Sequence, residues 1–260
     1  AVDREIISRD ESFNCERGAY RMGRRILHDH HPYGQLSVTD IIVKSSNIGM
    51  AKIGERMTNR SLYEAAVTFG FGRRTGTELP GELSGLVRRL SKWDRYSTGS
   101  IPMGQELAVT PLQLIAAHAA LANGGKLLSP RLVLGDMEAM EEFNRRPSPM
   151  ATSQVVAKTV GAEAAAWVVS GPMRGVVQRG TGKKAQLPDF TVFGKSGTAQ
   201  KHDPATGKYS TNRHVCSFVC GAPAENPRAL VLVLVDEPTV GTSHYGGTVA
   251  APAASRILQK

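Results

Sequence analysis

The order of hydrophobic patterns along the chain is the strongest constraint on its fold. Apolar residues recur at helical spacing through much of residues 37–180, whereas the last third of the chain holds three strand-like apolar runs. These runs cover residues 190–200, 215–221 and 229–236, and the Pro- and Asn-rich segment 222–228 joins the last two into an antiparallel hairpin. Helices grouped before sequential strands predict an α+β fold, in which helices flank an antiparallel sheet, rather than alternating βαβ units.

Cap residues divide the helical part into separate helices. Ser37 to Asp40 offers N-cap residues before an apolar run, and Ser45-Ser46-Asn47 separates this helix from an amphipathic helix over 48–57. Further helices are expected at residues 61–69, 110–122, 163–177 and 249–258. Polar, loop-like or variable connections are expected at residues 1–36, 76–93 and 137–153. We expect residues 1–260 to form one portion of a single domain, mostly helical over 37–180, with strands and a closing helix over 190–260.

Composition and charge restrict the partners. The chain has 260 residues, of which 41% are hydrophobic, so it can bury a core, and its formal net charge is +9. This charge fits an anionic polymer, anionic lipid headgroups or simply a solvated basic surface. The basic residues are scattered, with no basic helix interleaved with aromatic residues, so we expect no nucleic-acid partner.

Cysteines and histidines give little sign of a metal or of a disulfide framework. The chain has three cysteines, an odd and low number. Cys216 and Cys220 read as positions on one strand about 13 Å apart, too far for a disulfide, and are expected to be small core residues. The run His28-Asp29-His30-His31 suggests metal binding, but no Cys or second carboxylate follows at ligand spacing. We expect no metal and no cofactor.

Two short motifs have the residue types of an acyl-transfer site. In Lys195-Ser196-Gly197-Thr198, the lysine at a strand edge offers positive charge, the two hydroxyls offer donors to an anionic group, and Gly197 lets a substrate backbone approach closely. Ser45 and Asn47, at a break between two helices, can act as proton carrier and amide donor. Taken singly, the first motif also fits a surface strand end and the second an ordinary helix boundary.

The two motifs occur in the order of the Ser-x-Asn and Lys-[Ser/Thr]-Gly motifs of penicillin-binding proteins and serine β-lactamases. From about residue 20 to the end, the chain resembles the transpeptidase domain of class B (monofunctional) penicillin-binding proteins. The resemblance is carried by Lys44 to Lys52, Gly104-Gln105, Val109 to Gln113, Ala122 to Gly125, Val176-Val177, Gly180 to Gly182, Gly194 to Gln200, Ser217-Phe218, Ala222-Pro223, Asn226 to Arg228, Val235 to Pro238, Tyr245 to Gly247 and Ala250 to Pro252.

The resemblance also implies what this chain lacks. The family's third motif, Ser-x-x-Lys, holds the nucleophile and occurs nowhere in the chain. We expect a fragment whose nucleophile segment falls just before Ala1, and we expect the fragment alone neither to cross-link nor to bind penicillin covalently. The family's three-layer fold has a five-stranded sheet whose first two strands precede that motif. The strand around residues 231–235 should then present an open apolar edge.

The family mechanism assigns a role to each candidate residue. Ser45 would relay a proton towards the leaving amine, and Asn47 would hydrogen-bond the nucleophile motif's lysine and the substrate's peptide group. Lys195 would raise the positive potential and tune Ser45. Ser196 and Thr198 would hold the substrate's terminal carboxylate beside Gly197. The backbone N–H of Thr198 would form half of an oxyanion hole, contributing about 3 kcal/mol to lowering the barrier.

The implied activity is that of a peptidoglycan D,D-transpeptidase, which cross-links D-Ala-D-Ala stem peptides through a serine acyl-enzyme and is acylated by β-lactams. Other cell-wall synthesis proteins of the division or elongation machinery are the expected protein partners. The family is anchored in the plasma membrane by one N-terminal helix, outside this fragment, with the domain on the periplasmic or extracellular side. A β-lactamase or β-lactam sensor and a non-catalytic peptidoglycan-binding module remain as alternatives. Each reading of the site requires Ser45 and Lys195 to share one site.

Overall fold

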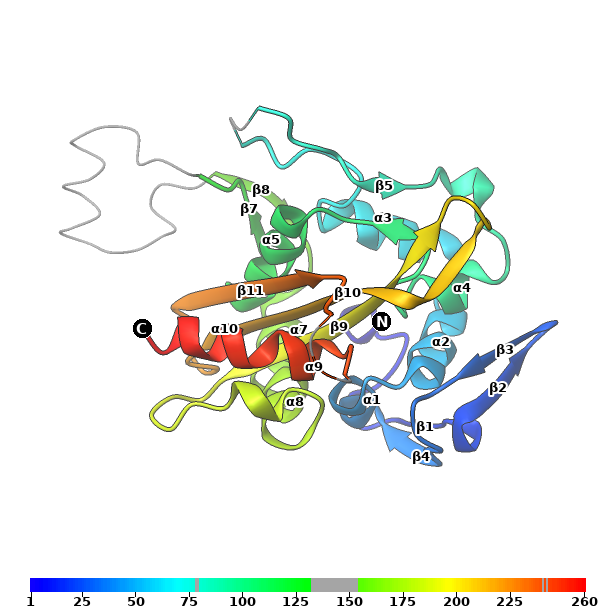
Figure 1. Ribbon diagram of the computed structural model, residues 1–260, viewed down its shortest axis with the longest axis horizontal. Coiled ribbons are helices and arrows are strands. Elements are labelled where there is room, and N and C mark those ends of the chain that lie inside the picture. Colours follow the sequence, from blue (N-terminus) through cyan, green and yellow to red (C-terminus); the bar gives the residue numbers. More distant parts are fainter. Residues whose placement is uncertain (78–79, 132–153, 240, 242) are drawn as a thin grey trace.

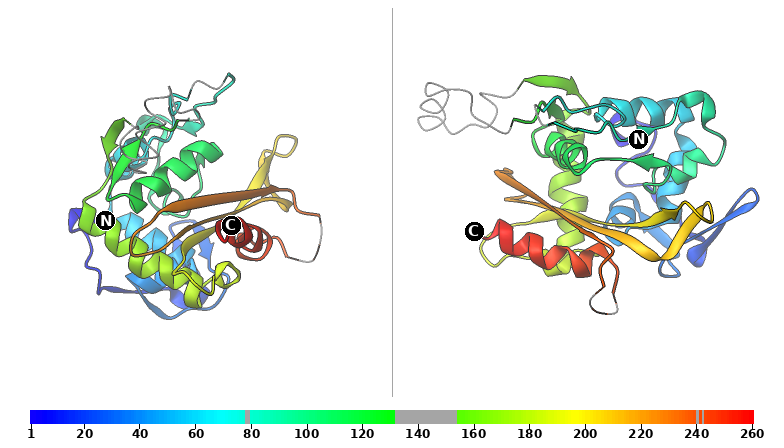
Figure 2. Two further views of the ribbon diagram at one scale, coloured as in Figure 1. Left: turned by 90° about the vertical axis from the view of Figure 1, so that its left-hand side faces the viewer. Right: turned by 45° about the horizontal axis from the view of Figure 1, so that its top comes forward.

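The computed structural model describes residues 1–77, 80–131, 154–239, 241 and 243–260. A three-stranded antiparallel sheet runs through the structure in the order β11-β10-β9, with helices on both faces (Figures 1 and 2). Its strands are β9 (Phe193–Asp203), β10 (Lys208–Ala222) and β11 (Ala229–Asp236). Helices α9 (Gly246–Val249) and α10 (Ala251–Leu258) cover one face, and α5 (Pro111–Ala122) lies on the other. Helix α8 (Arg174–Arg179) packs against β9 and contributes to the core beside α10. The expected α+β fold is confirmed.

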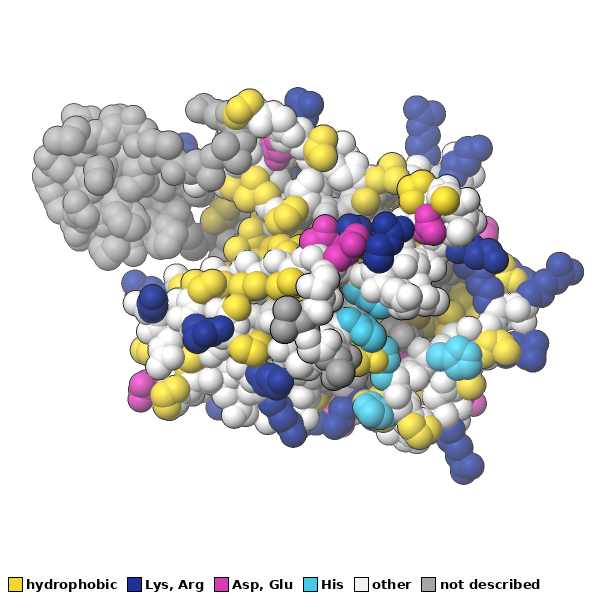
Figure 3. All heavy atoms as spheres, in the orientation of Figure 1, with side chains coloured by type: hydrophobic (Ala, Val, Ile, Leu, Met, Phe, Trp, Pro, Cys, Tyr) yellow, Lys and Arg dark blue, Asp and Glu magenta, His cyan; other side chains and the backbone are white. Residues whose placement is uncertain are grey.

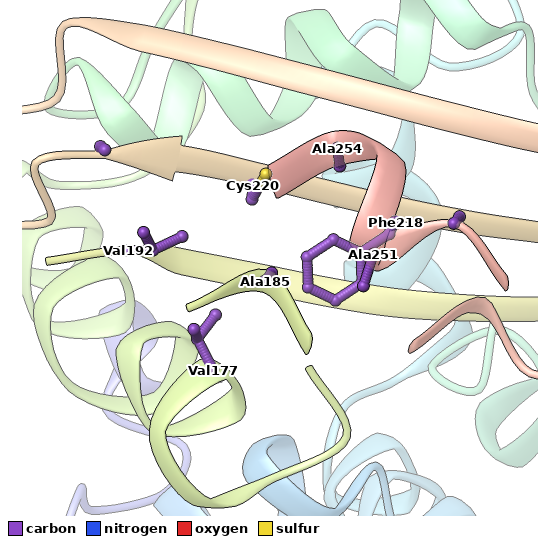
Figure 4. Close-up of a cluster of buried hydrophobic side chains, with 9 residues drawn as sticks. Val177, Ala185, Val192, Phe218, Cys220, Ala251 and Ala254 are labelled. Atoms are coloured by element: carbon purple, nitrogen blue, oxygen red, sulfur yellow. The ribbon is translucent and has the colours of Figure 1, made fainter. Parts of the chain in front are cut away.

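The alternation of side chains along the sheet assigns residues to its two faces. Phe218 and Cys220 on β10 point towards α10, where they join a core cluster with Val177 and Ala251 (Figure 4). Phe193 on β9 belongs to a separate core cluster that draws on α5 and on the segment before α8. Since successive strand residues point to opposite faces, residues of β9 near residue 195 alternate between these two environments. Cys216 and Cys220 are fully buried free cysteines, as expected.

The remaining helices follow their sequence signals closely. Thr110 caps α5 and forms a capping box with Gln113, whose side chain accepts from the Thr110 N–H. The other α-helices of the described residues are α1 (Val38–Lys44), α2 (Asn47–Arg56), α3 (Asn59–Thr68), α4 (Ser97–Ser100) and α7 (Ala162–Val168). The helix expected over 163–177 is α7 and α8 joined by a π-helical segment, η4 (Val169–Met173), which contains Pro172.

The N-terminal part differs from expectation, because residues 1–36 are not only loops. Strands β2 (Ala19–Met22) and β3 (Arg25–His28) form a hairpin, and β1 (Ser12–Asn14) pairs with β4 (Gln35–Ser37). Further short strands are β5 (Leu86–Val87) with β6 (Leu107–Ala108) and β7 (Lys126–Leu128) with β8 (Val155–Lys158). Short 3-10 helices lie at Val2–Arg4 (η1), Glu16–Gly18 (η2), Leu90–Lys92 (η3) and Lys183–Ala185 (η5). The variable connection expected at 137–153 lies outside the described residues.

Among the described helices, none combines the length and the apolar character needed to cross a membrane.

Strand β11 is an edge strand, as the family resemblance predicted. It pairs with β10 along its whole length, from Ala229 opposite Ala222 to Asp236 opposite Val215. No other strand of the described residues pairs with its outer edge. The strand is rich in Val and Leu, and Leu234 is 38% exposed. Unpaired backbone groups beside exposed apolar side chains are a template for pairing with another chain.

We therefore expect the 260-residue chain to self-associate through β11 as its concentration rises. Leu234→Lys places a charge on this strand and should reduce the associated fraction severalfold in sedimentation velocity, because an edge charge opposes strand addition. The matched control is Leu83→Lys, which changes a leucine that is 71% exposed and belongs to no strand. Equal association of the two variants would contradict pairing at this edge.

Candidate active site

The first half of the site is a break between two helices. Ser45 is the C-cap of α1 and adopts a left-handed backbone conformation, with φ of 57°. Ser46 is the N-cap of α2, and its hydroxyl accepts from the Gly49 N–H at 2.9 Å. The left-handed residue ends one helix and redirects the chain into the next. This geometry places Ser45 and Asn47 at adjoining helix ends rather than inside a helix.

The loop that follows β3 holds this break in place. The fully buried Ser46 donates its hydroxyl to Asp29 Oδ2 at 2.7 Å, and the Ile48 N–H donates to Asp29 Oδ1 at 3.1 Å. The Asn47 amide nitrogen donates to the His28 carbonyl oxygen at 3.0 Å. Asp29 also brings a negative charge to the N-terminus of α2, where the helix dipole favours it. The orientation of Asn47 is therefore set by a residue 19 positions earlier in the chain.

Lys195, the third residue of β9, contacts this break directly. Its Nζ donates to Ser45 Oγ at 2.9 Å and to the Ser196 carbonyl oxygen at 2.9 Å. The expectation that Ser45 and Lys195 share one site is confirmed. Burial lowers the pKa of Lys195 from its ordinary 10.5 to about 8. The ammonium is a charge held in a poorly solvated position, a feature common at functional sites.

Two hydroxyls of the β9 motif lie in a local network. Ser196 Oγ is 2.7 Å from the hydroxyl of Thr181, which lies in the turn after α8. Thr198 Oγ1 accepts from the Gly246 N–H at 3.1 Å, at the start of α9, while the Thr198 side chain is exposed. A Cβ on Gly246 would lie 2.3 Å from the Gly197 carbonyl oxygen, so the α9 segment can approach β9 this closely only as glycine.

Some residues of the site were not among the expected site residues, and Asp29 and Thr181 are the clearest cases. A third is His118 on α5, whose Nδ1 is 2.8 Å from the Leu114 carbonyl oxygen. Burial, with a smaller contribution from the charge of Lys195, lowers the pKa of His118, so the imidazole beside this lysine is kept neutral. In the described part of the chain, no three His, Cys, Asp or Glu side chains are grouped to hold a metal ion.

The fold is shared with solved penicillin-binding proteins. The structure superposes on the TP domain of Burkholderia pseudomallei penicillin-binding protein 3 with a TM-score of 0.87 and 29% identity, covering 99% of this chain and 73% of that one. For penicillin-binding protein 3 of Mycobacterium tuberculosis complexed with aztreonam, the TM-score is 0.83 and the identity 29%, covering 99% of this chain and 58% of that one.

The family follows from the sequence comparison. The model of the penicillin binding protein transpeptidase domain matches residues 1–259, and the chain belongs to this family, among its class B members. It is 34% identical to stage V sporulation protein D of Bacillus subtilis over 228 residues, which cover 87% of this chain and 34% of that protein. It is 32% identical to penicillin-binding protein PbpB of M. tuberculosis over 265 residues, which cover 98% of this chain and 38% of that protein. The chain thus spans little more than a third of the length of these two relatives.

Proposed function

We propose that this chain supplies the proton-relay and substrate-binding half of a peptidoglycan D,D-transpeptidase site. The observation that carries the proposal is the 2.9 Å contact between Lys195 Nζ and Ser45 Oγ, which joins two motifs that lie 150 residues apart. A hydroxyl that receives a hydrogen bond from a cation of lowered pKa is suited to pass a proton. The nucleophilic serine belongs to the family's Ser-x-x-Lys motif, which the 260 residues do not contain.

In the proposed reaction, the serine oxygen attacks the carbonyl carbon of the penultimate D-Ala of a stem peptide. The serine's proton is taken up by the lysine of its own motif and relayed through Ser45 to the departing amine as the C–N bond to the terminal D-Ala breaks. An amine of a neighbouring stem then attacks the acyl ester, the C–O bond to serine breaks, and the proton that this amine loses passes to the serine oxygen. Two easier steps replace one difficult step, as in other covalent mechanisms. β-Lactams would acylate the same serine as substrate mimics.

The remaining residues bind and orient the stem peptide in this proposal. Ser196 and Thr198 donate hydrogen bonds to the terminal carboxylate near the positive charge of Lys195. Gly197 leaves room for the substrate backbone, and the Thr198 N–H faces the developing oxyanion. Asn47, held by His28, presents its amide oxygen to the lysine of the nucleophile motif. We also propose that the parent protein works at the outer face of the plasma membrane with other cell-wall synthesis proteins.

The proposal is tested by completing the site. A family segment with the Ser-x-x-Lys motif, placed before Ala1, should allow the chimera to be labelled by fluorescent penicillin and seen after denaturing electrophoresis. Lys195→Ala should slow this labelling by at least about a hundredfold, since one electrostatic donor at such a site contributes on the order of 3 kcal/mol. Lys201→Ala, on the same strand, should leave the rate unchanged. Equal rates for the two variants would argue against the proposed role of Lys195.

The 260-residue chain without such a segment is expected to remain unlabelled by the same penicillin. Ser45 receives a hydrogen bond from the ammonium of Lys195, so its oxygen is a proton acceptor and not an activated nucleophile. A stable fluorescent band at the mass of this chain would contradict this expectation. Release of hydrolysed β-lactam by the chimera, in repeated turnovers, would instead identify a β-lactamase.

A further inference from the structure

A second site-like feature lies at the tip of the β2–β3 hairpin. The hairpin turns through the two residues Gly23 and Arg24, and it faces the turn that precedes α4. The guanidinium carbon of Arg25 lies 4.3 Å from the ring centroid of Tyr96, and that of Arg95 lies 4.8 Å from the same centroid. The Tyr96 oxygen accepts from the Arg24 N–H at 3.2 Å and from Arg95 Nη2 at 2.9 Å. We refer to Arg24, Arg25, Arg95 and Tyr96 as the arginine–tyrosine cluster.

The cluster carries positive charge that is not neutralised locally. All three arginines are exposed, and no carboxylate oxygen of the described residues lies within 4.0 Å of their guanidinium nitrogens. Asp94 is the acidic neighbour in sequence, and one of its carboxylate oxygens accepts from the Tyr96 N–H at 2.7 Å. Hydrogen bonds from Arg95 and from the Arg24 backbone lower the pKa of Tyr96, consistent with a positive potential there. Figure 3 shows Lys and Arg side chains projecting from this end of the molecule.

The cluster is built on two anchored segments. At the base of the hairpin, the Tyr20 hydroxyl donates to Glu55 Oε2 at 2.7 Å, and Lys52 Nζ lies 4.7 Å from the Tyr20 ring centroid, so α2 holds the hairpin. On the other side, the Asn59 amide donates to the Asp94 carbonyl oxygen at 2.8 Å, which ties the turn to the start of α3. A partner that binds here meets a largely preorganised surface and loses little free energy to ordering it.

We propose that the arginine–tyrosine cluster is a docking surface for an acidic peptide segment of a partner protein. Both guanidinium groups lie beside the Tyr96 ring, and Arg95 uses Nη2 for its bond to the Tyr96 oxygen. We infer that their remaining N–H groups are available to carboxylates of a partner. Arginine and tyrosine are the residues enriched at the energetic centres of protein interfaces. A membrane surface instead selects extended basic patches.

The surface uses none of the residues of the proposed transpeptidase site, so its test does not depend on acylation. The probe is a fluorescein-labelled acidic peptide of alternating glutamate and leucine, titrated with the 260-residue chain and followed by fluorescence anisotropy at physiological ionic strength. Replacing both Arg25 and Arg95 by alanine should weaken binding by about tenfold or more. The matched control replaces Arg73 and Arg74, an exposed arginine pair elsewhere, and should change the affinity less than about twofold.

Tyr96→Phe provides a finer test. It retains the stacking ring but removes the oxygen that accepts from Arg24 and Arg95, so a loss of about two- to fourfold is expected, smaller than that of the double variant. Circular dichroism of each variant shows whether the chain is folded. Equal losses for the two double variants would overturn the proposal in favour of diffuse charge attraction. Binding of phosphatidylglycerol vesicles but not of the peptide, abolished by the Arg25 and Arg95 replacements, would overturn it in favour of a lipid surface.

Discussion

Replacing Lys195 by methionine is expected to make the folded chain more stable at pH 7, by about 2 kcal/mol. Burial lowers the pKa of Lys195 from 10.5 to about 8, and that difference corresponds to about 3 kcal/mol against the charged form in the folded state. Methionine fills similar space without a charge, but it gives up hydrogen bonds to Ser45 and Ser196, each worth about 1 kcal/mol or less for the neutral amine. The midpoint of thermal unfolding should rise by about 5 °C.

The gain in stability that we expect from Lys195→Met should depend on pH in a definite direction. Below about pH 8 the lysine is protonated in both the folded and the unfolded chain, so the full penalty of burying the charge is present. Between about pH 8 and pH 10.5 the folded chain loses the proton while the unfolded chain retains it, so the stability of the unmodified chain rises with pH. The advantage of Lys195→Met should therefore shrink across this interval. Guanidinium unfolding of both chains at several pH values measures it.

Lys201 offers a matched control on the same strand. It forms ion pairs with Asp236 and Glu237, which raise its pKa. A group with a raised folded-state pKa contributes stability below its unfolded pKa and loses it only above 10.5. Lys201→Met should therefore not stabilise the chain, and its effect should stay constant from pH 7 to pH 10. If Lys195→Met behaved in the same way, the lysine would not be a destabilising buried charge.

The buried ammonium of Lys195 lowers the stability of the fold, and its proposed role in catalysis explains why it is present. Positions where a local rule is broken are expected at functional sites, because selection for activity tolerates a local loss of stability. Lys195 breaks the rule that charges stay solvated, and it does so where it reaches Ser45. The proposed proton relay requires a cation beside Ser45, which accounts for the buried ammonium of Lys195.

The sequence reveals the parts of the fold that depend on local pattern. The strand expected at 229–236 is observed with those bounds, because its unbroken run of Val and Leu is a strong sequence signal for a strand. The strand expected over 215–221 extends much further, as β10 covers Lys208–Ala222. Its first half is polar and exposed, so hydrophobic periodicity carries no signal there. Pairing with β9 forms that half, and pairing between strands is a tertiary property.

The residues of the site likewise fall into those that a sequence motif marks and those that only tertiary contacts bring into place. Ser45, Asn47 and Lys195 were found because short motifs mark them, and the structure brings Ser45 and Lys195 into contact. Asp29 was considered only within a histidine-rich run that suggested a metal. Its actual contacts, with Ser46 and the Ile48 N–H, join segments that approach only in the folded chain. A residue that positions another through tertiary hydrogen bonds has no local pattern of its own.

The second large effect is expected from Asp29→Ala, which should destabilise the chain by about 3–5 kcal/mol. The carboxylate accepts two hydrogen bonds, and each bond to a charged group contributes about 1.5–3 kcal/mol. The Ser46 side chain is fully buried, so water cannot replace the lost partner of its hydroxyl. Asp29→Asn retains an acceptor oxygen and should cost about half as much. Asp189→Ala removes the same charge from an exposed position and should change stability by less than about 0.5 kcal/mol.

A double-mutant cycle separates positioning by Asp29 from a general loss of packing. If Asp29 acts through the Ser46 hydroxyl, its replacement should cost less in a Ser46→Ala background, with a coupling energy of about 1–2 kcal/mol. Additive effects would show that the carboxylate stabilises the loop in some other way. The same contact carries a functional consequence, because Asn47 follows Ser46 directly and its amide bonds the carbonyl of His28, the residue before Asp29. In the completed chimera, Asp29→Asn should therefore slow penicillin labelling by about tenfold or more while the chain stays folded, since small displacements of a positioned group reduce reaction rates strongly.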